Sequence, residues 1–166
     1  SYYEFEDYIS HTDGKRTLFE KMYHFIKRKA IRDKVSLINS YQPLKGRILD
    51  IGAGTGDFLL EAKNQNWDIL GIEPNDKAKG IAVGKGIKFG DTIEKLESNS
   101  FDVITMWHVL EHVPDVEHQV AELKRLLKPS GTIIIAVPNF KSYDANHYKE
   151  FWAAYDVPRH LWHFSK

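Results

Sequence analysis

One glycine-rich stretch combines the residue types of a cofactor-binding loop with two carboxylates. Residues 48–58 read ILDIGAGTGDF, in which strand-like chain runs into glycine at every second position, namely Gly52, Gly54 and Gly56. Asp50 precedes these glycines and Asp57 follows them. Glycine allows positive φ and lets the backbone approach a ligand closely. The stretch therefore predicts a ligand-binding loop, and its negative charge restricts the ligands that fit.

Two phosphate-bearing ligands fit this loop poorly. A nucleoside triphosphate loop ends in Gly-Lys-Ser/Thr, whereas Gly56 is followed by Asp57 and Phe58. A dinucleotide loop needs G-x-G-x-x-G, and the sixth position counted from Gly52 is Asp57. Two carboxylates beside a pyrophosphate would also repel it, at a cost of roughly a few kcal/mol near a protein surface.

S-adenosylmethionine fits the loop better because it has no phosphate. It carries an ammonium, a sulfonium and a single carboxylate, so Asp50 and Asp57 complement its cationic groups. The glycines let the backbone approach its methionine part, and the first amides of the following helix can meet its carboxylate. The loop therefore predicts S-adenosylmethionine as the cofactor.

Two acidic residues further along the chain have the spacing of adenosine contacts. Glu73 ends the second predicted strand, in GIEPN, where a carboxylate can accept hydrogen bonds from both ribose hydroxyls. Asp91 follows the third predicted strand, in KFGDT. Its carboxylate either accepts from the adenine amino group or caps the segment Thr92–Leu96, and spacing alone does not separate these two roles.

These residues need a scaffold, and the chain after Pro43 has the pattern of an α/β domain, residues 44–166. Apolar strands are predicted at Arg47–Ile51, Asp68–Glu73, Gly86–Gly90, Phe101–Trp107 and Thr132–Val137. Helices are predicted at Asp57–Asn66, Asp76–Val83 and Asp115–Leu127, and a turn at Lys128–Gly131. This alternation predicts a doubly wound, mainly parallel sheet. Ligands of such sheets bind at the carboxyl ends of the strands where strand order reverses, which is where the glycine loop would lie.

An N-terminal helical cap, residues 1–43, is predicted to precede this core. From Lys15 to about Tyr41, apolar residues recur at helical spacing in two groups, which are Leu18, Met22, Phe25 and Ile26, then Val35, Ile38 and Tyr41. We expect a pair of helices that pack on the core and turn a basic face to solvent.

The composition of the 166 residues narrows the class of protein. The formal net charge is zero, so no nucleic-acid partner is expected. The absence of cysteine rules out disulfides, thiolate metal sites and a cysteine nucleophile, and it is compatible with the cytoplasmic location that we predict. No apolar run approaches transmembrane length, so no membrane partner is expected.

Five motifs follow one another in an order and spacing that resemble the class I S-adenosylmethionine-dependent methyltransferases: LDIGAGTGDF, GIEPN, FGDT, FDVITMWHVLEHVPD and LLKPSGTIIIAVPN. The resemblance covers roughly residues 43–166 and implies a Rossmann-like methyltransferase fold. It implies that the methionine part is cradled by Asp50, Gly52, Gly54 and Gly56. It also implies that Glu73 binds the ribose, that Asp91 and Thr92 meet the adenine, and that Trp107 and His108 line the cofactor's far side.

Residues 137–166 resemble a broad subgroup of small-molecule methyltransferases within this class. In that subgroup, a stretch like DVPRHLWHFS precedes a helix and a final antiparallel hairpin. The sequence stops at Lys166, so we expect a piece truncated before that hairpin, with a five-strand variant as the alternative. The strand left bare, TIIIAV, is long and apolar, and such edges pair with other chains. Two outcomes are therefore open: the tail Tyr143–Lys166 folds over this edge, or two chains pair there, and self-association is the outcome that we predict.

Methyl transfer requires chiefly that a nucleophile be held in line with the methyl group and that water be excluded. A general base is needed when the acceptor is a hydroxyl or a protonated amine. The candidate bases are His108, Glu111, His112, His160 and His163, and His112 is the one that we predict. The alternative is that Glu111 and His112 satisfy local backbone groups around Val113-Pro114. No metal site is predicted, because no spaced set of histidines and carboxylates converges in the sequence.

The predicted partner is a small-molecule methyl acceptor bound by the aromatic tail, through Tyr155, Arg159 and His160. Many large rings gather there in few residues, and aromatic walls suit planar or amphipathic acceptors. The same rings would equally well fill a core. Arg159 and His160 indicate either an anionic group on the acceptor or a buried ion pair.

The predicted function is transfer of a methyl group from S-adenosylmethionine to a small molecule. One alternative is a non-catalytic domain that binds this cofactor or its demethylated product, because the sequence supports cofactor binding more fully than catalysis. Another is a nicotinamide-dependent oxidoreductase, which the missing glycine of G-x-G-x-x-G disfavours.

Overall fold

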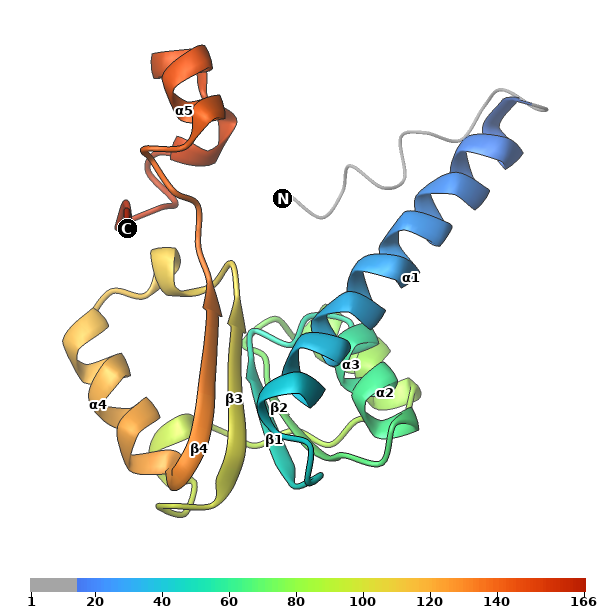
Figure 1. Cartoon of the computed structure of the whole chain (residues 1–166), viewed down its shortest axis with the longest axis vertical. Coiled ribbons are helices and arrows are strands. Elements are labelled where there is room, and N and C mark those ends of the chain that lie inside the picture. Colours follow the sequence, from blue (N-terminus) through green and yellow to red (C-terminus); the bar gives the residue numbers. More distant parts are fainter. Residues whose placement is uncertain (1–14) are drawn as a thin grey trace.

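Four apolar strands pair into a parallel sheet (Figure 1). The computed structural model describes residues 15–166, and its strands are β1 (Arg47–Ile51), β2 (Asp68–Ile72), β3 (Phe101–Trp107) and β4 (Leu127–Ala136). The strand order is β2-β1-β3-β4, with every neighbouring pair parallel. Because the chain winds outward from β1 to β2 and, on the other side, from β3 to β4, the order reverses between β1 and β3. This arrangement confirms the predicted doubly wound α/β fold.

Helices connect and cover these strands. They are α1 (Lys15–Tyr41), α2 (Asp57–Asn64), α3 (Asp76–Gly84), α4 (Val116–Leu126) and α5 (Tyr143–Tyr148), with short 3₁₀ turns at Ile93–Lys95, Leu110–His112, Lys149–Phe151 and Ala153–Tyr155. Asp115 caps α4 as predicted, because its Oδ1 accepts a hydrogen bond of 2.9 Å from the amide of His118. Among the described residues, no helix combines the length and apolar character needed to span a membrane.

The sheet is covered on both faces, with α1, α2 and α3 on one side and α4 on the other (Figure 1). Successive side chains of a strand point to opposite faces, so Ile48 belongs to one buried cluster and Leu49 to the other. The first cluster includes Val35, Ile38, Phe58, Leu59 and Val103, and the second includes Phe101, Ile104, Met106, Leu123 and Leu126. Burial on both faces explains why the strands are apolar throughout.

The predicted third strand is the main correction to the sheet. Residues 86–90 form only an isolated bridge, in which Phe89 pairs with Gly71 of β2. Two backbone hydrogen bonds hold it, from the Gly71 amide to the Lys88 carbonyl (3.0 Å) and from the Gly90 amide to the Gly71 carbonyl (2.9 Å). Glycines at both ends of this stretch weaken a strand, and Gly86 adopts a φ of 77°. The described part of the chain therefore has four strands where five were predicted.

The predicted turn at Lys128–Gly131 is also wrong, because these residues belong to β4. The pairing of β3 with β4 shifts between Phe101↔Leu127 and Val103↔Thr132, so β4 carries extra residues at this point. A bulge of this kind accommodates Pro129, which cannot donate a ladder hydrogen bond, on a strand that lies at the edge of the sheet.

The N-terminal region forms one helix of 27 residues, not the predicted pair. Its second half packs on the core through Val35 and Ile38, but Met22, Phe25 and Ile26 are 52%, 63% and 57% exposed. The reason is geometric, since the first half of α1 projects past the carboxyl edge of the sheet (Figure 1). Residues 1–14 of the predicted cap and the side chain of Leu18 lie outside the described residues, so the domain division at residue 43 stays a prediction.

The segment after β4 leaves the sheet and carries α5 beyond the carboxyl edge (Figure 1). It closes on itself, because the amide of Phe140 donates to the carbonyl of Phe164 (3.0 Å) and Asn139 bridges to Phe164. Within residues 15–166, β4 therefore pairs only with β3, and Ile135 is 37% exposed. The free edge that the sequence predicts is present in the described chain.

Candidate cofactor-binding and active site

A cleft of about 690 Å³ lies at the carboxyl edge of the sheet, where the strand order reverses. It brings together most of the predicted site residues: Gly52, Gly54, Glu73, Asp91, Thr92, Trp107, His108 and His112. Three carboxylates, from Glu73, Asp91 and Glu94, line it, and no lysine or arginine does among the described residues. An acidic wall suits a cationic, hydroxyl-bearing ligand and would repel a pyrophosphate.

The three glycines of the loop have different structural roles. Gly54 has a φ of 52°, and apart from its chain neighbours a Cβ built on it would meet no described atom within 4 Å, so it leaves the backbone open to a ligand. Gly52 has a φ of 75°, and its Cβ would lie 2.4 Å from Cγ2 of Val109. Gly56 has a φ of 76° and faces Ala82 (2.8 Å) and Ile87 behind the cleft. The packing of the loop therefore accounts for Gly52 and Gly56, whereas Gly54 faces the space that a ligand would fill.

Glu73 is held at the end of β2 by two backbone amides. Its Oε2 accepts from the amide of Gly54 and its Oε1 from the amide of Asn75, both at 2.8 Å. The carboxylate thereby ties the ends of β1 and β2 together. Each carboxylate oxygen keeps a further lone pair, so the side chain can accept hydrogen bonds from a ligand while holding the loop.

Asp50 lies beneath the loop and not in the wall of the cleft. It is 2% exposed, and its Oδ1 accepts a hydrogen bond of 2.6 Å from the hydroxyl of Thr105. Burial raises its pKa to about 7, against the opposing effects of the Thr105 hydrogen bond and of Lys34, while Glu73 adds to the increase. Asp50 therefore acts on the cleft through its charge, and that charge depends on pH near neutrality.

Lys34 of α1 is a site residue that the sequence analysis missed. It is half-buried, its Nζ lies 4.3 Å from the centroid of the Trp107 ring, and it acts electrostatically on Asp50. Burial lowers the pKa of Lys34, and Asp50 partly restores it. One signal was available, because Lys34 precedes the buried Ile38 by four residues and so lies on the packed face of the helix.

Asp57, which was predicted to complement the positive charge of the cofactor, lies outside the cleft lining. Its Oδ2 lies 2.9 Å from Nζ of Lys27, and its Oδ1 lies 2.5 Å from Nζ of Lys85. Burial raises its pKa, but the bonds from Lys85 and Lys27 outweigh this effect and keep the pKa below its usual value. Its charge is thus taken up by α1 and by the end of α3, outside the cleft lining.

The loop that carries Asp91 and Thr92 forms the opposite wall. Asp91 is exposed and pairs with Lys95, which holds the pKa of its carboxyl below its usual value. The 3₁₀ turn that follows begins after Thr92 and has no side-chain cap, so the capping role considered for Asp91 is not found. The adenine role therefore remains as its prediction.

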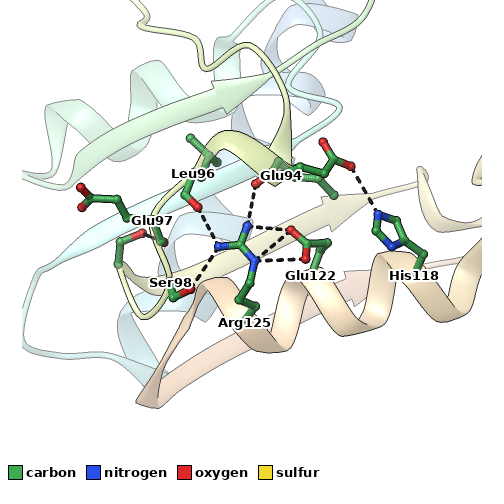
Figure 2. A network of polar contacts seen from close by, with 9 residues as sticks. Glu94, Leu96, Glu97, Ser98, His118, Glu122 and Arg125 are labelled. Atoms are coloured by element: carbon green, nitrogen blue, oxygen red, sulfur yellow. Dashed lines mark hydrogen bonds and ion pairs between the residues drawn. The ribbon is translucent and has the colours of Figure 1, made fainter.

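Arg125 of α4 anchors this loop (Figure 2). Its guanidinium donates to the carbonyls of Leu96 (2.7 Å) and Ile93 (3.0 Å), and it also pairs with Glu122 (2.6 Å). Because two backbone carbonyls are bound at once, the loop cannot shift relative to α4 without breaking both bonds.

Trp107 and His108 leave β3 and line the cleft as predicted. The Trp107 ring packs edge-to-face on Phe58 at 5.7 Å between centroids, and its buried Nε1 has no hydrogen-bond partner among the described residues. His108 adopts a φ of 58°, and its Nδ1 lies 3.5 Å from Oε1 of Glu111.

His112 lies in the cleft next to Glu111 and His160. Its Nδ1 is 3.0 Å from the carbonyl of Arg159, so we assign the proton to Nδ1, which leaves the Nε2 lone pair free to accept one. The rings of His112 and His160 are 4.6 Å apart. Glu111 is 1% exposed, and neither carboxylate oxygen has a hydrogen-bond partner within residues 15–166.

The same three residues offer ligand atoms that all lie within 4.8 Å of one another. No converging set is evident in the sequence, because His160 is far from Glu111 in the chain. The two segments meet because the amide of Leu161 donates to the carbonyl of Glu111 at 2.8 Å. A carboxylate and two imidazoles are donors that divalent transition metals accept, so the absence of a metal stays a prediction for metal analysis of the purified chain.

The structure separates the three predicted acceptor-binding residues. His160 reaches the cleft edge beside His112. The Arg159 guanidinium instead pairs with Asp156, at 2.9 Å from its Nε. The Tyr155 ring packs on Trp152 (5.2 Å) and His163 (5.4 Å), away from the cleft lining. A role for Tyr155 and Arg159 in acceptor binding stays a prediction, which their present packing does not support.

Comparison with known proteins agrees with this geometry. A family model described as a methyltransferase domain matches residues 22–166. The chain is 33% identical to a ubiquinone biosynthesis O-methyltransferase of Paraburkholderia phymatum over 123 residues, which are 66% of this chain and 53% of that protein. The chain thus spans about half the length of the curated relatives that it matches.

Solved structures show the same fold. An S-adenosylmethionine-dependent methyltransferase of Thermotoga maritima, described as a possible histamine N-methyltransferase, superposes with a TM-score of 0.61 at 25% identity, covering 83% of this chain and 68% of that one. A methyltransferase of Archaeoglobus fulgidus gives 0.62 at 23% identity, covering 86% and 68%. The fold and the cleft define a Rossmann-like methyltransferase domain. The chain belongs to the class I S-adenosylmethionine-dependent methyltransferase family.

Proposed function

We propose that this chain binds S-adenosylmethionine in the cleft and transfers its methyl group to a small-molecule acceptor. The observation that carries the proposal is the wall of the cleft, in which the Glu73 carboxylate and the open face of Gly54 meet and which, among the described residues, no lysine or arginine lines. Such a wall fits a ligand with hydroxyls and positive charge. It does not fit a pyrophosphate.

We propose that different residues of the chain bind different parts of the cofactor. Glu73 would accept from the ribose hydroxyls, Asp91 from the adenine amino group, and the backbone around Gly54 would lie against the methionine part. Asp50 beneath the loop would favour positive charge above it. The unpartnered Nε1 of Trp107 supports the view that a ligand completes this site.

Catalysis requires the chain to orient an acceptor and to take up its proton. Bound S-adenosylmethionine supplies a methyl group on a sulfonium, which is already an excellent leaving group. We propose an oxygen as the accepting atom, which the name of the O-methyltransferase relatives supports. His112, with Nδ1 directed to the Arg159 carbonyl, would accept the hydroxyl proton at Nε2 as the oxygen attacks the methyl carbon.

Calorimetry with S-adenosylmethionine, S-adenosylhomocysteine and NAD tests the cofactor assignment. We expect the first two to bind and NAD not to bind; binding of NAD alone would favour an oxidoreductase. A methyl-transfer screen over phenols, catechols, carboxylates and sugars then tests catalysis. Cofactor binding without turnover on any acceptor would favour the non-catalytic alternative.

The location of the protein and its lack of a nucleic-acid partner stay predictions. Fractionation of cells that express a tagged chain would test the cytoplasmic location. A mobility-shift assay with generic DNA and RNA would test the second prediction.

Replacing Glu73 with alanine is expected to weaken cofactor binding by tens- to hundredfold. Two ribose hydrogen bonds would be lost, which corresponds to about 2–3 kcal/mol. The substitution also frees the amides of Gly54 and Asn75, so Glu73→Gln, which retains one oxygen acceptor, provides the milder comparison. Unchanged affinity of Glu73→Ala in calorimetry would remove Glu73 from the ribose site.

The raised pKa of Asp50 predicts that cofactor affinity increases with pH. With the pKa at about 7, the carboxyl of the empty site is largely protonated below that pH. A cationic ligand favours the ionised form, so binding should release a proton, and affinity should rise by up to about tenfold per pH unit until it levels off above pH 7. Titrations between about pH 6 and pH 8 would measure this, and Asp50→Asn should flatten the curve.

The Asp50 carboxyl gives the stability of the folded chain a pH dependence opposite to that of the cofactor affinity. Its folded-state pKa of about 7 lies above the ordinary aspartate value of 3.8, so the folded chain binds the proton more tightly. The contribution of Asp50 to stability is therefore complete below about pH 4 and is lost as pH rises through about 7. Melting of the cofactor-free chain should show this loss, and Asp50→Asn should remove it. An affinity curve that is equally steep in Asp50→Asn would assign the pH dependence to another group.

We propose self-association through the free edge of β4. The strand exposes backbone donors and acceptors beside Ile135, and edges of this kind recruit further strands. Sedimentation of the chain should show dimers or larger species, and Ile135→Lys should shift them toward the monomer. Ile81→Lys, at an exposed position of α3, is the matched control. A monodisperse monomer of the unaltered chain would contradict the proposal.

A further inference from the structure

Gln119 is a buried polar side chain that the proposed mechanism does not use. It lies in the first turns of α4, is 8% exposed and lines the cofactor cleft. Its Nε2 has no hydrogen-bond partner among residues 15–166. Buried amide groups are nearly always paired, and leaving one unpaired is costly. A partner for this donor is therefore expected inside the cleft.

The position of α4 indicates which end of the cleft this donor serves. The helix is fastened to the loop that carries Asp91 and Thr92 through the Arg125 bonds to the carbonyls of Ile93 and Leu96 (Figure 2). One residue before Gln119, the imidazole of His118 lies 3.5 Å from Glu94 of the same loop (Figure 2). Gln119 thus lies against the wall that the adenine is proposed to contact.

We propose that Gln119 recognises the adenine ring, by donating a hydrogen bond from Nε2 to the ring nitrogen N1 or N7, the two that flank the amino group. The donor and acceptor chemistry agrees with this role. Asp91 can only accept and so suits the exocyclic amino group, whereas the amide NH₂ of Gln119 can donate to a ring nitrogen that carries a lone pair. Together the two residues would distinguish adenine from hypoxanthine, which carries an oxygen in place of the amino group.

This inference rests on the proposed function, because it requires S-adenosylmethionine in the cleft. The network of Figure 2 gives Arg125 a positioning role in it. By holding the loop to α4, Arg125 fixes the distance between Asp91 and Gln119. It does not line the cleft itself.

Calorimetry with S-adenosylhomocysteine and its 1-deaza and 7-deaza analogues tests the proposal on the whole chain. Gln119→Met preserves length and removes the donor, so we expect about tenfold weaker binding of S-adenosylhomocysteine, equivalent to ~1.4 kcal/mol. One of the two deaza analogues should bind equally to the unaltered chain and to Gln119→Met, because the acceptor is already missing. A merely structural effect of the substitution would lower the affinity for all three ligands by the same factor.

The control is Lys124→Met, an exposed position on the same helix, which should leave all affinities unchanged. Equal affinity of Gln119→Met and the unaltered chain for S-adenosylhomocysteine would overturn the inference, as would a loss that persists with both deaza analogues. Failure of the unaltered chain to bind S-adenosylhomocysteine at all would instead overturn the proposed function.

Discussion

Replacing Gly54 with valine is expected to abolish cofactor binding, lowering affinity by more than about a hundredfold, while the fold persists. A side chain at this position would project into open cleft, since a Cβ built there meets no described atom within 4 Å apart from those of its chain neighbours. The space that it occupies is the space proposed for the methionine part. Positive φ makes valine unfavourable here by about 1–2 kcal/mol, so the melting temperature should fall by several degrees without loss of the far-ultraviolet spectrum.

Two further glycines make this experiment specific. Gly80→Val adds the same bulk to α3, also into open space, at a residue without positive φ, and should leave affinity unchanged. Gly52→Val should instead destabilise the chain itself, because its Cβ would lie 2.4 Å from Val109. Normal binding by Gly54→Val would show that the loop is merely a tight turn.

The sequence predicted the parts of the fold that local patterns control. β1 and β3 have the predicted bounds, and α2, α3 and α4 differ from theirs by a few residues. Their apolar runs, glycines and the Asp115 cap act over short distances, so they can be recognised from neighbouring residues. The position of the glycine loop at the reversal of strand order followed from the order of the elements.

The predictions of secondary structure failed where packing against distant parts of the chain determines the local conformation. A helical pattern of apolar residues does not show whether the helix will have a core to pack against. For this reason the region of α1 was expected to form two packed helices. A single bridge between Phe89 and Gly71 replaced a predicted strand, because pairing depends on how closely the segment approaches β2. Proline is common in turns, which is why a turn was predicted at Pro129, yet a strand at the edge of a sheet also tolerates proline.

The residues of the site also depend on contacts between distant parts of the chain. The acidic residues that follow predicted strands line the cleft, as Glu73 and Asp91 show. Asp57 is also acidic and follows the glycine loop, but two lysines from distant elements bind it. Lys34, Gln119 and His160 enter the site only through packing of α1, α4 and the tail. Helical spacing places Lys34 on the packed face of α1, but a single sequence does not show which residues of distant segments these side chains meet.

Replacing His112 with alanine is expected to lower turnover by roughly 10²–10⁴-fold when the acceptor is a hydroxyl. The imidazole lines the cleft, and its Nδ1 faces the carbonyl of Arg159 at 3.0 Å, which leaves Nε2 as the base. Cofactor affinity should change little, because Glu73, Gly54 and the loop at Asp91 are untouched. Turnover and cofactor affinity, both measured with an acceptor found by the screen, check these two expectations. His147→Ala, at an exposed position of α5, is the control and should turn over normally. Near-normal turnover of His112→Ala on a hydroxyl acceptor would remove His112 from the mechanism and leave positioning of the acceptor, with no base, as the chain's contribution.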